Sequence, residues 1–353
     1  MSVHLLSAMD AMARYDQFDA VIDARSEGEY AEDHLPGALN WPSLDNAERI
    51  RVGTLYKQVS PFEAQKIGAA LVAANISRHI LAHVMDKPKN WQPLVYCWRG
   101  GKRSNSLALI LGQIGFKVHL IEGGYKAFRK AVVDDTPARV QPLQFRVLCG
   151  PTGSGKTRLL QALAAQGAQV LDLEAIASHR ASVLGVIPGQ PQPTQKAFET
   201  QLWDALRRLD PARPVFVEAE SKKVGNVTIP DSLIVTMRAS PCVRLELSLA
   251  HRVQLLMEDY DYFVKDAAFF CERLERLADL KGRAVIDDWK TRVHAGHTAD
   301  VVAELLGKHY DPGYETSTAR NFRQYAQALA LPLSGPDSQA MSRAASQLLQ
   351  PTS

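Results

Sequence analysis

Residues 145–157 read F-R-V-L-C-G-P-T-G-S-G-K-T, and this stretch decides the fold of the second half of the chain. The apolar run 145–149 predicts a buried strand, and the glycine-rich segment after it has the full spacing of a Walker A loop. Its glycines let several N–H groups point at one anion, and a following helix adds its positive end. The sequence therefore predicts a phosphate-binding loop made by Gly150, Gly153, Ser154, Gly155, Lys156 and Thr157.

The region after the loop continues to alternate between strands and helices. Short apolar runs predict strands at 169–171, 214–217, 233–237 and 243–247, and the pattern becomes mainly helical after residue 249. This alternation is typical of a parallel sheet covered by helices. We therefore expect a P-loop α/β domain with a helical extension at 145–333, followed by a flexible tail at 334–353 that is rich in polar and small residues.

The first half of the chain also alternates. Buried strands are predicted at 19–23, 94–96 and 118–121, and helices at 61–74 and 104–114. This pattern predicts a second α/β domain with a parallel sheet at 1–131. Residues 132–144 lose the periodicity and contain two prolines, so we expect a linker there.

Composition narrows the class of protein. The chain has 353 residues, 46% hydrophobic and 22% charged, which is enough for two domains with separate cores, and its net charge of +3 does not by itself indicate a nucleic-acid binder. The four cysteines are far apart and lack C-x-x-C spacing, which argues against a zinc site or a disulfide framework. No stretch has the length of a membrane span, and residues 1–14 lack the form of a signal peptide. We expect a cytoplasmic monomer that does not bind a membrane.

A cysteine stands in a second glycine-rich loop, C-W-R-G-G-K-R-S at 97–104. Backbone N–H groups and the start of the following helix can surround the sulfur of Cys97, while Arg99, Lys102 and Arg103 add positive charge. These effects favour the thiolate, and they would also hold a persulfide or perselenide anion. A buried structural cysteine is the alternative interpretation.

Three segments of the first half resemble rhodanese domains. They are D-A-R-S-E-G-E-Y at 23–30, H-L-P-G-A-L-N at 34–40 and E-G-G-Y-K-A-F-R at 122–129, and the loop of Cys97 fits the same pattern. The resemblance implies that Cys97 carries sulfur or selenium as a covalent adduct. It also implies that Asp23 and Arg25 are structural rather than catalytic.

A rhodanese-like domain followed by a P-loop domain resembles the tRNA 2-selenouridine synthase family, and the likeness spans nearly the whole chain. Besides the two loops, it is carried by L-D-L-E at 171–174, S-H-R at 178–180, P-T-Q-K-A-F-E at 193–199, V-E-A-E-S at 217–221 and H-Y-D-P-G-Y at 309–314. Ala181 departs from the pattern, in which glycine follows His-Arg.

Membership of this family would imply a two-step reaction on the wobble uridine of thiolated tRNA. A geranyl group from geranyl diphosphate alkylates the 2-thio group, and selenium from selenophosphate then displaces it. The implied substrates are geranyl diphosphate and selenophosphate, and the implied partners are tRNA and an enzyme that supplies selenophosphate. No tightly bound cofactor is expected, and Mg²⁺ is a candidate ion.

Further polar residues are candidates for the same chemistry. Asp172, Glu174, Glu218 and Glu220 follow predicted strands, where an acid/base group or an Mg²⁺ ligand would stand, but carboxylates at strand ends are mostly just solvated. His179, Arg180 and Lys196 are candidates for contacts with a phosphate or with tRNA, and a solvated surface is the alternative. The aromatic residues between 260 and 270 favour a core, with an apolar wall for the geranyl chain as the other interpretation.

Two other functions remain open at this point. One is a kinase-type ATP phosphotransferase with an accessory rhodanese module, and the other is a plain sulfurtransferase that uses thiosulfate. Turnover of MgATP without tRNA would favour the first, and rapid sulfur transfer from thiosulfate to cyanide would favour the second.

Overall fold

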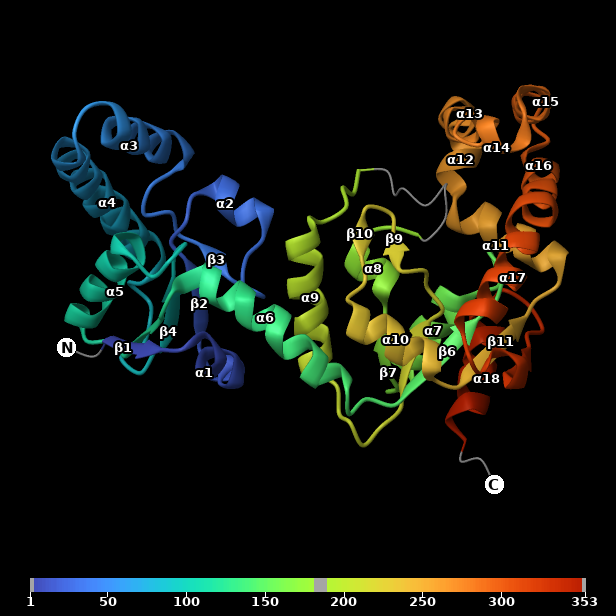
Figure 1. The fold of residues 1–353 in the computed structure, drawn as a ribbon, viewed down its shortest axis with the longest axis horizontal. Helices are drawn as coiled ribbons and strands as arrows, with labels where there is room; N and C mark the ends of the chain where they lie inside the picture. The colour runs from blue at the N-terminus through green and yellow to red at the C-terminus, as the bar shows by residue number, and fades with distance from the viewer. Residues whose placement is uncertain (1–2, 181–188, 351–353) are drawn as a thin grey trace. The chain divides into compact units, whose positions relative to one another are not determined.

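The computed structural model describes residues 3–180 and 189–350, so Ala181 and residues 351–353 lie outside the described part. The chain divides into two compact units. One consists of Met1–Thr136 and Pro193–Asp204, and the other of Pro137–Gln192 and Ala205–Ser353. Each unit contains a five-stranded parallel sheet with helices around it (Figure 1), which confirms the predicted α/β class.

The first unit has the strand order β1-β5-β4-β2-β3, and all neighbouring strands are parallel. Its strands are β1 (Val3–Leu6), β2 (Ala20–Asp23), β3 (Leu39–Asn40), β4 (Pro93–Tyr96) and β5 (Val118–Ile121). Its helices are α1 (Ala8–Ala13), α2 (Glu27–Glu32), α3 (Asn46–Gln58), α4 (Pro61–His83), α5 (Lys102–Ile114) and most of α6 (Gly124–Val140).

Alternate residues of the first sheet enter two separate hydrophobic clusters. Val21 and Leu94 pack with residues of α1 and α6, whereas their neighbours Ile22 and Val95 pack with residues of α4 and α5. Because successive side chains of a strand point to opposite faces, the sheet is covered on both sides. The ends of β4 and β2 therefore lie between helical layers, where they position the loop of Cys97.

The second unit has the strand order β12-β11-β6-β8-β7, again all parallel. These strands are β6 (Phe145–Cys149), β7 (Gln169–Leu171), β8 (Val215–Glu218), β11 (Cys242–Glu246) and β12 (Leu329–Pro332), and a small antiparallel pair is formed by β9 (Lys223–Val224) and β10 (Val227–Thr228). The helices near the sheet are α7 (Lys156–Ala165), α8 (Leu173–Ala177), α10 (Asp231–Ala239) and α18 (Ser338–Leu349), whereas most of α9 (Gln195–Arg207) belongs to the first unit.

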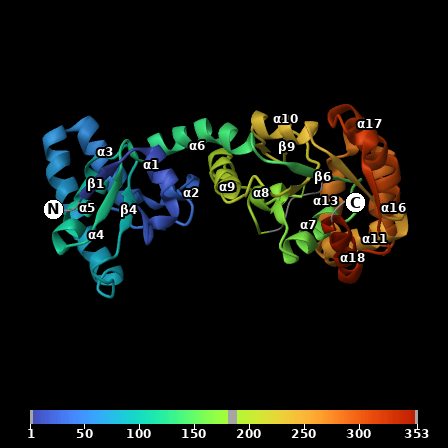
Figure 2. The same cartoon turned by 90° about the horizontal axis from the view of Figure 1, so that it is seen from below.

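A group of helices between β11 and β12 forms the extension predicted after residue 249, and these helices gather together in both views (Figures 1 and 2). They are α11 (Leu249–Asp259), α12 (Asp261–Lys265), α13 (Ala267–Glu275), α14 (Ala278–Lys281), α15 (Arg283–His294), α16 (Thr298–Leu305), the π-helical turn η2 (Leu306–Tyr310) and α17 (Asp311–Asn321). Phe263, Phe270 and Trp289 are at the centre of its core. Among the described residues, no helix has the length and apolarity needed to cross a membrane.

The structure differs from the predicted linker at 132–144, because α6 continues to Val140. Its buried positions Val132, Asp135, Thr136 and Val140 follow helical spacing, but two of them are polar and hide the periodicity. Trp203 donates a hydrogen bond of 2.9 Å to Asp135, and Thr136 donates one of 2.6 Å to the Val132 carbonyl. These hydrogen bonds satisfy the buried polar groups of Asp135 and Thr136, so the helix can continue through both positions.

The predictions of a flexible tail at 334–353 and of a strand at 233–237 are also wrong, because both segments contain a helix. Residues 338–349 form α18, where Ala340, Met341, Ala344 and Ala345 are buried against α7. The small side chains that resembled a loop composition instead allow two helices to approach. Residues 233–237 belong to α10 rather than to a strand, because Leu233, Ile234 and Met237 are buried on one helical face.

Candidate functional site

The predicted phosphate-binding loop joins β6 to α7, as the sequence indicates. Gly153 and Gly155 have φ angles of +78° and +87°, a region that favours glycine. A Cβ on Gly155 would also lie only 2.6 Å from the methyl carbon of Met341 in α18. Glycine at position 155 is therefore required by the backbone conformation, whereas the flexible end of the Met341 side chain can shift away from a Cβ.

Lys156 and Tyr314 meet at the start of this loop. The Lys156 ammonium donates a hydrogen bond of 2.7 Å to the Gly150 carbonyl, and the Tyr314 hydroxyl accepts one of 2.5 Å from the Gly150 N–H. The Lys156 nitrogen lies 5.8 Å from the centre of the Tyr314 ring. Tyr314 comes from α17, so the helical extension contributes directly to the shape of the phosphate-binding loop.

Three carboxylates lie close together beside the loop. Oxygen atoms of Glu174, Glu218 and Glu220 lie within 4.8 Å of one another, and the Thr157 hydroxyl donates a hydrogen bond of 3.4 Å to Glu174. Burial, followed by repulsion from Glu174, raises the pKa of Glu218 to about 8. The same two causes, in the same order, raise the pKa of Glu220. Neither carboxylate oxygen of Glu218 has a hydrogen-bond partner among the described residues.

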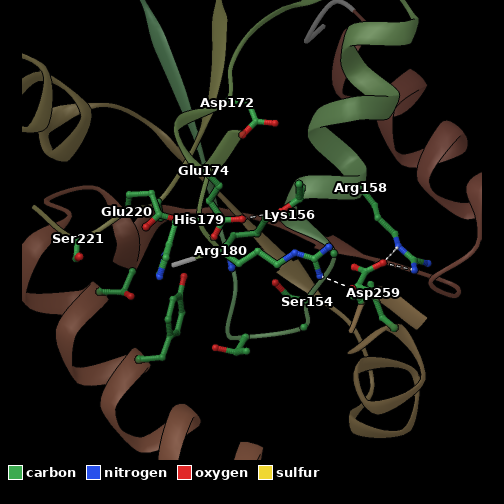
Figure 3. Close-up of a pocket in the computed structure, with 18 of the residues that line it drawn as sticks. Ser154, Lys156, Arg158, Asp172, Glu174, His179, Arg180, Glu220, Ser221 and Asp259 are labelled. Carbon is green, nitrogen blue, oxygen red and sulfur yellow. Dashed lines mark hydrogen bonds and ion pairs between the residues drawn. The ribbon is translucent and has the colours of Figure 1, made fainter. Parts of the chain in front are cut away.

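A cavity of about 470 Å³ opens over the phosphate-binding loop (Figure 3). It brings together predicted site residues from distant parts of the second unit, namely the loop residues 153–157, Asp172, Glu174, His179, Arg180 and Glu220. Glu218 does not line this cavity but lies next to Glu174 and Glu220. A cavity of this size falls in the range of roughly 300–1,000 Å³ typical of small-molecule sites.

His179 and Arg180 both line the cavity, but they differ in what they contact. The Arg180 guanidinium donates a hydrogen bond of 2.7 Å to the Asp259 carbonyl and lies 4.5 Å from the centre of the Tyr260 ring. His179 is only 6% exposed, and its Nδ1 has no partner among the described residues. Burial lowers the pKa of His179, so the neutral ring is favoured.

Asp172 and Lys196, two further predicted site residues, form contacts with groups of the protein itself. Asp172 caps α8 by accepting a hydrogen bond of 2.8 Å from the Ala175 N–H, and burial raises its pKa. Lys196 belongs to the first unit, where its ammonium lies 2.5 Å from a carboxylate oxygen of Glu32. The structure therefore assigns Lys196 to a different unit from His179 and Arg180.

The second predicted site is the loop of Cys97 in the first unit. The Cys97 side chain is 3% exposed, and its sulfur accepts hydrogen bonds from the Gly101 N–H at 3.2 Å and the Ser104 hydroxyl at 3.1 Å. Helix α5 begins at Lys102, directly after this N–H. Hydrogen-bond donors and a helix N-terminus therefore face the sulfur, as the sequence predicts.

The three basic residues of this loop are not equivalent. Arg103 forms a two-pronged ion pair with Glu29, with N–O distances of 2.6 Å and 3.2 Å, whereas Arg99 and Lys102 are exposed. This pair offsets the charge of Arg103, so the guanidinium contributes less positive potential than the sequence alone indicates. Its carboxylate partner comes from α2 and is part of the segment at 23–30.

Close backbone contacts hold the Cys97 loop in place. A Cβ on Gly124 would lie 2.2 Å from the Cys97 carbonyl oxygen, which explains the glycine pair at 123–124. Beside it, Arg25 pairs with Asp23 at 2.6 Å, and both side chains are almost fully buried. Arg25 also donates to the Asp33 carbonyl and lies 4.0 Å from the centre of the Tyr125 ring. The contacts agree with a structural role for Asp23 and Arg25.

Sequence reasoning from motifs missed several residues that shape the cavity. Buried Arg252 donates to the Thr152 carbonyl at 2.8 Å and pairs with Asp311 at 2.6 Å, so it ties the phosphate-binding loop to α17. Arg158 pairs with Asp259 at 2.6 Å. Asp311 and Tyr314 could have been identified from the family-like segment at 309–314, which contains both residues. No motif in the local sequence points to Arg252 or Asp259.

The fold and the two loops define a rhodanese-like domain joined to a P-loop α/β domain. Residues 6–131 match the family model of the rhodanese-like domain, and residues 143–271 match that of the tRNA 2-selenouridine synthase AAA domain. The chain belongs to the tRNA 2-selenouridine synthase family, as relatives that align over most of its length show.

Two of these relatives carry the name tRNA 2-selenouridine synthase and align over most of both chains. The protein from Sulfurovum sp. is 31% identical over 85% of this chain and 89% of its own length, and that from Pseudomonas fluorescens is 33% identical over 83% and 87%. The protein of the same name from Nitrosomonas europaea is 38% identical over 68% of this chain. For this relative and three others, the chain spans only 62–66% of the relative's length.

Proposed function

We propose that the chain is a tRNA-modifying enzyme that converts 2-thiouridine at the wobble position into 2-selenouridine. In the first step the sulfur attacks C1 of geranyl diphosphate, the C1–O bond breaks and diphosphate leaves. In the second step selenide-level selenium from selenophosphate, held at Cys97, attacks C2 of the base: the Se–P bond has broken to give phosphate, the C2–Se bond forms, and the C2–S bond breaks so that geranylthiol leaves. Family membership supports the overall activity, and the reducing cytoplasm, where selenophosphate chemistry and free thiols are compatible, is the proposed location.

The observation that best supports the first step is the convergence of Lys156, the phosphate-binding loop and three carboxylates beside one cavity. A diphosphate leaving group develops negative charge as the C1–O bond breaks, and fixed N–H groups and a lysine stabilise such charge. Lys156 donates to the Gly150 carbonyl in this structure, a position from which its ammonium can turn to a bound phosphate. We assign diphosphate binding to this loop.

The residues beside the loop also fit Mg²⁺. The Thr157 hydroxyl and the carboxylates of Glu174, Glu218 and Glu220 are oxygen donors of the kind that Mg²⁺ prefers, and the buried oxygens of Glu218 have no hydrogen-bond partner among the described residues. Bound Mg²⁺ would neutralise charge on a diphosphate. We propose that these residues hold Mg²⁺ when the substrate is bound.

The buried sulfur of Cys97 supports the second step. Two hydrogen-bond donors and the start of α5 face this sulfur, and such surroundings stabilise a thiolate or a perselenide anion. Cys149 and Cys242 are also buried, but a hydrogen bond with the Cys242 thiol, followed by burial, raises the pKa of Cys149. We therefore assign the role of selenium carrier to Cys97 rather than to the thiols beside the phosphate-binding loop.

Mass spectrometry of thiolated tRNA tests this function directly. Incubation with geranyl diphosphate should add one geranyl group to the 2-thiouridine, and later addition of selenophosphate should replace sulfur by selenium. ATP hydrolysis without any change in the tRNA mass would instead favour the phosphotransferase, and sulfur transfer from thiosulfate to cyanide would favour the plain sulfurtransferase.

A further inference from the structure

A small apolar pocket lies next to the phosphate-binding loop, within the second unit. It is lined by Thr152, Leu256, Met257, Tyr260, Phe263, Phe270, Thr298, Val302, Leu305, Leu306 and Tyr310. No charged side chain is among these residues, in contrast to the larger cavity with its lysine, arginines and carboxylates. The pocket therefore suits a hydrocarbon and not a second anion.

The pocket and the larger cavity share part of their walls. Thr152, Leu256 and Tyr260 line both. Thr152 is itself a residue of the phosphate-binding loop, and its carbonyl is held by Arg252. A ligand whose anionic end is bound by the loop can therefore pass along Leu256 and Tyr260 and place an apolar end in the pocket.

The size of the pocket limits what it can take. Its volume is about 40 Å³, and a water molecule needs roughly 10–15 Å³ by the same measure, so it has room for about three or four non-hydrogen atoms. This matches the dimethylvinyl end of an isoprene unit, which has four carbon atoms. Met257 lines the pocket, and its unbranched side chain can change rotamer to fit an irregular hydrocarbon.

We propose that this pocket binds the terminal isoprene unit of the prenyl diphosphate and thereby selects its chain length. The inference rests on the proposed function, because it identifies which residues hold the chain of the geranyl donor. Val302 of α16 is half-buried and lines the pocket, so its size sets the depth available to the chain. Each methylene removed from water strengthens binding by about fourfold, which makes affinity a sensitive measure of depth.

The test uses the full chain and four ligands: inorganic diphosphate, and the diphosphates of the five-carbon dimethylallyl, ten-carbon geranyl and fifteen-carbon farnesyl groups. Calorimetry measures each Kd for the wild type, for Val302→Phe, which fills the pocket, and for Val302→Ala, which enlarges it. Ala299→Phe places the same ring on an exposed position of α16 and serves as the matched control.

We expect Val302→Phe to bind geranyl diphosphate at least tenfold more weakly while its Kd for inorganic diphosphate stays within twofold of the wild type. Val302→Ala should shift the preference towards farnesyl diphosphate, and Ala299→Phe should match the wild type. Since a folding defect would weaken all four ligands together, a change confined to chain length reports on the pocket.

Unchanged chain-length preference in both Val302 variants, in a wild type that does form S-geranyl RNA, would overturn the pocket assignment alone. A wild type that binds inorganic diphosphate but forms no S-geranyl RNA would instead overturn the proposed first step. The two failures are therefore distinguishable.

Discussion

The hydroxyl of Tyr314 accepts a hydrogen bond of 2.5 Å from the backbone N–H of Gly150, so α17 fixes the first residue of the phosphate-binding loop. The two residues are 164 positions apart in sequence. Burial raises the pKa of the Tyr314 phenol, which keeps the group neutral. The loop is therefore completed by the helical extension rather than by the β6-α7 connection alone.

Replacement of Tyr314 by phenylalanine should weaken the binding of inorganic diphosphate by about two- to tenfold, because one hydrogen bond of roughly 0.5–1.5 kcal/mol that holds the loop is lost. Calorimetry provides the Kd. Tyr325→Phe is the control, since Tyr325 is a buried tyrosine that does not line the cavity. Equal affinities in the two variants would show that Tyr314 does not shape the phosphate site.

Arg25→Ala should lower the free energy of unfolding by about 3–5 kcal/mol, because the buried carboxylate of Asp23 loses its charged partner and keeps only the hydrogen bonds from the Tyr96 hydroxyl and from the backbone N–H of residue 25. Urea denaturation measures this change. The control is Arg51→Ala at an exposed position of α3, for which we expect a change within about 0.5 kcal/mol. A small effect for Arg25→Ala would argue that the pair is not structural.

His119 should make the protein less stable in mild acid. Burial lowers its pKa to about 4, whereas an unfolded histidine has a pKa near 6.5. As pH falls from about 6.5 to 4, the unfolded state takes up the proton first, so this contribution to stability is present above that window and lost within it. Both ring nitrogens lack a hydrogen-bond partner among the described residues, so nothing there offsets the burial.

The measurement for His119 is the urea midpoint of the wild type and of His119→Leu between pH 7 and pH 4.5. The wild type should lose more stability than the variant over this range. Because other titrating groups act on both proteins, only the difference reports on His119, and parallel pH profiles would contradict the prediction.

Cys97→Ser should abolish selenium incorporation and leave S-geranyl formation unchanged, because serine can accept the same hydrogen bonds from Gly101 and Ser104 but cannot carry selenium. Mass spectrometry of the tRNA and labelled selenium measure both outcomes. Cys271→Ser is the control for a cysteine in the helical core. Labelled selenium on a cysteine other than Cys97 would refute the assignment.

Local sequence patterns predicted both loops well, since each loop depends on neighbouring residues. The β6 strand, the glycines and Lys156 form a continuous motif, and so do Cys97, the glycines after it and α5. The contacts that complete them were not predictable in this way. Tyr314 and Arg252 reach the phosphate-binding loop from distant helices, and Glu29 offsets the charge of Arg103 from α2.

The wrong predictions for α6 and α18 have a common physical cause. The helical periodicity of α6 is carried partly by Asp135 and Thr136, and that of α18 by alanines, so neither segment has a clear apolar stripe. Both helices are stabilised by partners that local sequence does not reveal, Trp203 for α6 and the leucines of α7 for α18. Tertiary packing, rather than local sequence pattern, therefore makes these two segments helical.

The central claim is that the phosphate-binding loop serves the prenyl step and Cys97 serves the selenium step. Lys156→Ala should lose most S-geranyl formation, since removal of one such contact costs roughly 2–4 kcal/mol in the transition state. The most direct measurement supplies synthetic RNA that already carries S-geranyl-2-thiouridine, together with selenophosphate, and quantifies 2-selenouridine. The account predicts near wild-type product from Lys156→Ala and none from Cys97→Ser. An inactive Lys156→Ala on this RNA would contradict two separate sites and would mean that the phosphate-binding loop also serves selenation.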